Sequence, residues 1–62
     1  MTISYELQRI ALMLRERGII DNTIHGRLIG RAVAVDRETG QSRTEATAAA
    51  IRDLCKTLRL LL

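Results

Sequence analysis

Apolar residues recur at three- and four-residue spacing along three successive stretches of this chain, and the stretches are separated near Gly18 and Gly40. Residues at this spacing share one face of an α-helix. A glycine after a charged stretch is typical of a helix C-terminus, because glycine adopts positive φ at low cost. The pattern predicts three helices, over residues 3–17, 22–39 and 42–61.

Polar residues at the start of each stretch supply candidate helix caps. Thr2 or Ser4 can cap the first helix, and Asp21, Asn22 and Thr23 are the candidates for the second.

The corner between the second and third predicted helices has the clearest helix-end and helix-start signals in the chain. Gly40 is expected to end one helix, and only Gln41 separates it from Ser42. Ser42 and Glu45 fit a capping box, in which the hydroxyl caps the N3 amide and the N3 carboxylate reaches back. So short a connection predicts two helices folded sharply against each other.

A strand over residues 20–26 is the alternative to a helix start in that part of the chain. Apolar Ile20 and Ile24 would alternate with polar side chains, but Asn22 would then lie on the apolar side. The helix is therefore the preferred prediction.

A chain of 62 residues makes a single domain, residues 1–62, whose core is marginal because only about 60% of the unfolded surface is buried at this size. One cysteine and one histidine supply neither an intrachain disulfide nor a zinc site. The aliphatic content is high, with nine Leu and seven Ile. We therefore expect an all-α fold of three short helices in an intertwined homo-oligomer, most simply a dimer.

Two sets of residues are candidates for the oligomer interface. Small residues at four-residue spacing allow close helix approach in the second helix, and aliphatic residues form a stripe on the third. The candidates are Gly26, Gly30, Ala34, Ile51, Leu54, Leu58 and Leu61.

The charge is mildly basic, with ten Lys and Arg against seven Asp and Glu, and nine of the ten are arginine. Arginine suits phosphate because its planar fork donates several hydrogen bonds. Arg27 and Arg31 lie one helical turn apart, and Arg43 flanks the corner. They are candidate phosphate contacts; the alternative is a solvent-exposed face balanced by nearby carboxylates.

The string "TGQSRTEATAAAIRDL" resembles the turn and second helix of ribbon-helix-helix proteins, especially the antitoxin repressors of toxin–antitoxin pairs. The resemblance implies that Ser42 and Thr44, with their amides and Arg43, contact a DNA phosphate. It also implies an alternative fold, with a short strand near residues 20–26 that pairs with its twin in the major groove. An extra helix would precede that strand here.

No catalytic constellation is found, so we expect neither an enzyme, a cofactor nor a metal. Cys55 lies on the apolar stripe, where a free cysteine behaves as a small buried hydrophobe. Neither a signal peptide nor a membrane span is expected, and the lone thiol suits the cytoplasm. The sequence favours a small dimeric DNA-binding transcriptional regulator. The alternative is a non-enzymatic helical interaction module, of adaptor or antirepressor type, whose partner is another protein such as a toxin or repressor.

Overall fold

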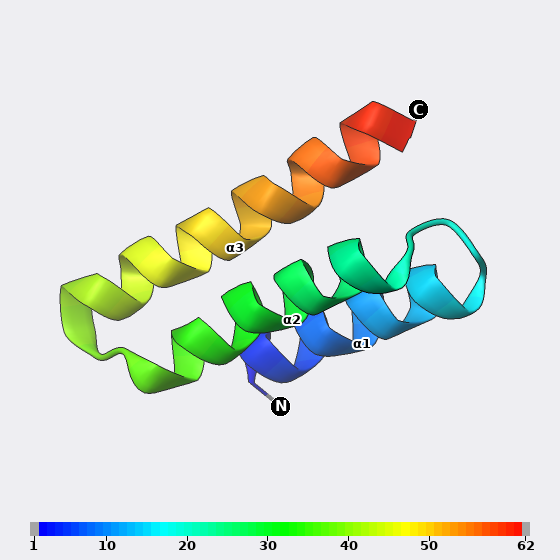
Figure 1. Cartoon of the computed structure of the whole chain (residues 1–62). Helices are drawn as coiled ribbons and strands as arrows, with labels where there is room; N and C mark the ends of the chain where they lie inside the picture. The colour runs from blue at the N-terminus through cyan, green and yellow to red at the C-terminus, as the bar shows by residue number, and fades with distance from the viewer. Residues whose placement is uncertain (1, 62) are drawn as a thin grey trace.

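The computed structural model describes the backbone of residues 2–61 and the side chains of residues 2–59 (Figure 1). Its helices are α1 (Ile3–Glu16), α2 (Asn22–Arg37) and α3 (Gly40–Leu61). No strand occurs within these residues, so the predicted all-α class is confirmed. Each helix begins and ends within two residues of its predicted bound.

Side-chain caps begin the first two helices. Thr2 Oγ1 accepts a hydrogen bond from the Tyr5 amide (3.1 Å), and Asp21 Oδ1 accepts one from the Ile24 amide (2.8 Å). Each cap satisfies a first-turn amide that has no partner inside the helix. Because Asp21 caps α2, residues 22–26 are helical in the single chain rather than extended.

Gly18 ends α1 as predicted. Its φ is +71°, its amide donates to the Arg15 carbonyl (3.0 Å), and the Ile19 amide donates to the Leu14 carbonyl (2.9 Å). This pair of hydrogen bonds is the Schellman motif, which requires a left-handed residue at the position that glycine occupies. The chain then turns, and Ile20 is buried in the core.

The predicted details of the second corner are wrong. α2 ends at Arg37, Glu38 is extended (φ −106°, ψ 159°), and α3 already begins at Gly40 with φ +57°. The Thr39 carbonyl accepts from the Arg43 amide (3.3 Å), so a backbone group starts the helical hydrogen bonds upstream of Ser42. Gly40 serves the start of α3 rather than the end of α2, because its positive φ lets a two-residue connection reverse the chain.

The α2 helix runs between α1 and α3 and is antiparallel to both (Figure 1). It packs extensively against each neighbour, whereas α1 and α3 barely touch. Ala11 and Leu14 of α1 form the core with Ile20 and Leu28. The partly buried residues packed against this core are Ile10, Ile24, Ile29, Leu54 and Leu58. The corner therefore folds α3 back along α2, as its short connection predicts.

Two glycine substitutions are expected to have opposite effects. Gly18→Ala should lower the free energy of unfolding by about 1 kcal/mol, because positive φ raises the free energy of an alanine in the folded state. Gly30→Ala should raise it by about 1 kcal/mol, because Gly30 lies inside α2 and nothing stands within 4 Å of an added Cβ. Urea denaturation followed by circular dichroism measures both. A destabilising Gly30→Ala would mean that another helix lies against this face.

Candidate functional site

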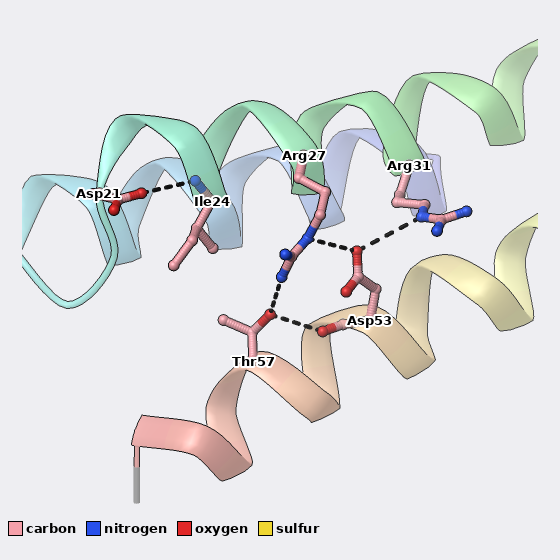
Figure 2. A network of polar contacts seen from close by, with 6 residues as sticks. All are labelled: Asp21, Ile24, Arg27, Arg31, Asp53 and Thr57. Carbon is pink, nitrogen blue, oxygen red and sulfur yellow. Dashed lines mark hydrogen bonds and ion pairs between the residues drawn. The ribbon is translucent and has the colours of Figure 1, made fainter.

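A polar cluster joins α2 to α3 (Figure 2). Asp53 Oδ2 lies 3.2 Å from Nε of Arg27 and 3.6 Å from Nε of Arg31. Nη2 of Arg27 donates to Thr57 Oγ1 (3.1 Å), and the same hydroxyl donates to the Asp53 carbonyl oxygen (2.9 Å). One carboxylate and one hydroxyl of α3 thus hold two arginines of α2.

Helical spacing builds this cluster from two antiparallel helices. The two arginines lie one turn apart on α2, and Asp53 and Thr57 lie one turn apart on α3. The Asp53 side chain is 14% exposed, whereas those of Arg27 and Arg31 are 52% and 55% exposed. Asp53 Oδ2 is buried without an aligned hydrogen bond, so its attraction to both cations is ionic. Since solvent screens the exposed guanidinium groups, the cluster contributes only about 1 kcal/mol to stability.

Further cations surround the same carboxylate. Arg31, Arg52 and Lys56 line one shallow hollow together with Asp53 and Ala49. We call Arg27, Arg31, Arg52 and Lys56 the basic face. Removing these four cations and Asp53 from the ten basic and seven acidic residues of the sequence leaves six of each. The four cations and Asp53 therefore carry a formal charge of +3, and the other charged side chains of the sequence are equal in number.

The basic face contains two of the predicted DNA-binding residues and two that sequence reasoning left out. Arg27 and Arg31 were expected, and the structure adds Arg52 and Lys56. The four-residue interval between Arg52 and Lys56 was a usable signal. It did not assign these two residues to a DNA-binding face, because nothing in the sequence says which side of α3 adjoins α2.

The other predicted DNA-binding residues lie apart from this face. Ser42, Arg43 and Thr44 are exposed in the first turn of α3. Arg43 precedes Asp53 by about 15 Å of helix at a 1.5 Å rise per residue. Nine residues separate Arg43 from Arg52, which is about two and a half turns, so the two point to opposite sides of α3. Thr44 Oγ1 donates to the Gly40 carbonyl (3.4 Å) within the helix.

The two glycines of the predicted oligomer interface have no close neighbour among the described residues. Gly26 and Gly30 are exposed, with nothing within 4 Å of an added Cβ, and Ala34 is half-buried. No close helix contact therefore forms at these glycines inside the described chain. A contact with a second molecule there stays a prediction.

The aliphatic part of the predicted interface lies beside an apolar groove between α1 and α3. A gap of only about 10 Å³ forms the floor of this groove and is too small for more than one water. It is surrounded by Leu7, Leu28, Ala50 and Leu54. Ile3 on α1, and Ile51 and Leu58 on α3, lie at helical spacing from the residues around this gap and continue its two apolar walls. We define the α1–α3 groove as Ile3, Leu7, Ala50, Ile51, Leu54 and Leu58.

The rims of the groove are open to solvent. Ile3 is 50% exposed and Ile51 is 46% exposed, while Leu54 and Leu58 are half-buried. Cys55 lies beside them and is exposed, so the fold of the single chain does not bury it as predicted. The physical reason is that α1 and α3 barely meet, which leaves half of the α3 stripe uncovered. The side chain of Leu61, also predicted in the interface, lies outside the described residues.

The described residues contain no group of three or more His, Cys, Asp or Glu that could hold a metal ion. His25 lies beside Tyr5, Leu12 and Ile29 in a shallow surface hollow between α1 and α2. None of the helices, as far as they are described, is long and apolar enough to span a bilayer.

In comparisons with known proteins, no family model, curated protein or solved structure matches this chain. Its own surfaces, the basic face and the α1–α3 groove, are therefore the candidate functional sites.

Asp53→Asn is expected to lower the free energy of unfolding by about 1 kcal/mol at low salt, because two cations then lose their shared carboxylate. The loss should shrink in 1 M NaCl, where the charges are screened. Asp36→Asn is the matched control, since Asp36 is exposed in the last turn of α2, where a carboxylate opposes the helix dipole. Urea denaturation at two salt concentrations distinguishes them. Equal effects of both variants would contradict a structural role for the cluster.

Proposed function

We propose that this chain is a small homodimeric DNA-binding protein that regulates transcription in the cytoplasm. The observation that carries the proposal is that the basic face gathers four exposed cations around one carboxylate, with a formal charge of +3. Phosphate contacts from Lys and Arg supply most of the sequence-independent affinity of proteins for duplex DNA.

Geometry supports a role for this face in phosphate binding. Asp53 engages Nε of both arginines, and their side chains are more than half exposed. Because Nε is the inner nitrogen, the outer N–H groups of Arg31 stay directed away from the carboxylate (Figure 2). Arg52 and Lys56 are exposed beside it. Four cations on adjacent helices can meet up to about four phosphates of a duplex in each subunit.

A second route to DNA follows from the resemblance to ribbon-helix-helix proteins. It uses the first turn of α3, where Ser42, Arg43 and Thr44 surround exposed amides at the positive end of the helix dipole. In that route, residues 22–26 would leave α2 and pair as a strand with a second copy. The capped start of α2 at Asp21 favours the basic face instead.

A helical protein–protein interaction module is the second candidate function. It is favoured by the open α1–α3 groove, since uncovered aliphatic surface marks interaction sites in soluble proteins. An adaptor or antirepressor of this kind would dock a toxin, a repressor or another protein there, and it would have no affinity for DNA.

The proposal predicts duplex binding whose strength falls steeply with salt. The double variant Arg52→Gln, Lys56→Gln removes two cations from each subunit and should lower the slope of log Kd against log salt by about 3.6 for the dimer, because about 0.9 is expected for each phosphate contact. The control is Arg15→Gln, Arg17→Gln, which removes the same charge from the last turn of α1. Fluorescence anisotropy with a labelled duplex from 50 to 200 mM NaCl measures the slopes. Absence of binding at 50 mM NaCl would leave the interaction module as the function.

Arg43→Glu separates the two routes to DNA. Binding through the basic face should change less than about threefold, because Arg43 lies on the opposite side of α3, beyond the screening length of about 10 Å. A loss similar to that of Arg52→Glu, in the same anisotropy assay, would instead favour the first turn of α3 and the ribbon-helix-helix route.

A further inference from the structure

We propose that a second copy of this chain closes the α1–α3 groove, forming an isologous dimer whose basic faces stay exposed. This inference rests on the homodimer of the proposed function and specifies where its two copies meet. It places the interface on Ile3, Leu7, Ile51, Leu54 and Leu58, and away from the small-residue stripe of α2.

The exposed area of the chain exceeds that of a compact monomer. The chain exposes 4501 Å², whereas about 4,000 Å² is expected for a compact protein of 7.0 kDa. The excess of about 500 Å² is more than half of the roughly 800 Å² that each partner buries in a standard interface. Contact between α1 and α3 is slight, which leaves the facing sides of both helices open to a partner.

The chemistry of the groove suits a second copy of the same chain. Its six defining residues are all aliphatic and carry no charge, so a positively charged copy meets no like charge there. The basic face lies on the side of α3 that adjoins α2, and the groove lies on the side toward α1. Two copies can therefore join their grooves while their cations remain apart.

Another exposed apolar surface fits a partner less well. Tyr5, Leu12 and Ile29 lie between α1 and α2, but Arg9 and His25 line the same hollow. Burying these polar groups would cost free energy unless the partner supplied matching acceptors. The groove imposes no such requirement, which is why we place the dimer there.

The single cysteine of the sequence offers a way to detect the dimer by crosslinking. In an isologous contact, residues near the two-fold axis meet their own copies. Cys55 is exposed between Ile51 and Leu58, at the middle of the α3 wall. Cys55 borders the groove without being one of its residues, so the two Cys55 thiols are expected at the rim of the contact, within reach of a short bismaleimide.

The test compares matched aspartate substitutions by sedimentation equilibrium, without DNA. Wild type should be a dimer, and Ile51→Asp should weaken association at least about 100-fold, because it would bury a charge. Leu12→Asp is the control, since Leu12 is 39% exposed against 46% for Ile51 but lies on the other apolar surface. Gly30→Ala should also leave association unchanged. Dissociation by Leu12→Asp or Gly30→Ala, with Ile51→Asp still dimeric, would overturn the inference.

A second measurement holds even if Ile51→Asp fails to fold. A short bismaleimide should crosslink most of the wild-type protein through Cys55 at micromolar concentration. The double variant Cys55→Ser, Thr23→Cys moves the only thiol to exposed Thr23 of α2 and should crosslink at least about tenfold less. Equal crosslinking of both, or a monomeric wild type, would overturn the inference. A monomer that still binds duplex DNA would overturn it while leaving the DNA-binding part of the proposed function intact.

Discussion

Packing of Leu28 between two helices is the contact on which the rest of this structure depends. Leu28 is 5% exposed, belongs to the core with Ala11 and Leu14, and also meets Leu54 of α3. Full burial of one leucine stabilises a fold by about 1.5–3 kcal/mol, which is a large share for a chain of this size. Because α2 serves both neighbours, α1 and α3 are placed relative to it and only indirectly relative to each other.

That arrangement separates two kinds of surface on α3. Asp53 and Thr57 face α2 and hold its arginines, with further cations just outside them. The aliphatic stripe turns toward α1, which is too far round α2 to cover it. One helix therefore carries charge along one edge and an open apolar surface along another. Together these surfaces fit a protein that pairs with its own copy and presents cations to a polyanion.

The two corners between helices show which turns can be predicted from neighbouring residues and which cannot. Gly18 was predictable because the Schellman motif depends on residues close together in the chain, all of which were visible. At the second corner the same reasoning placed Gly40 and Ser42 wrongly. Two solutions compete there: a hydroxyl cap at Ser42, or a backbone cap at Thr39 with positive φ at Gly40. Both are compatible with the local sequence, and the docking of α3 on α2 decides between them.

The sequence by itself determined the three helices, their bounds to within two residues, the preferred all-α class and the candidate caps, because each depends on spacing or on neighbouring residues. The structure selected Thr2 and Asp21 among those candidates. Only the tertiary structure decided which side of each helix meets another. It buried Thr57, left Asp53 partly buried and Cys55 exposed, and joined Arg52 and Lys56 to the arginines of α2. Periodicity shows that a helix has an apolar face, but the rotation of one helix against the next depends on packing between residues far apart in the chain.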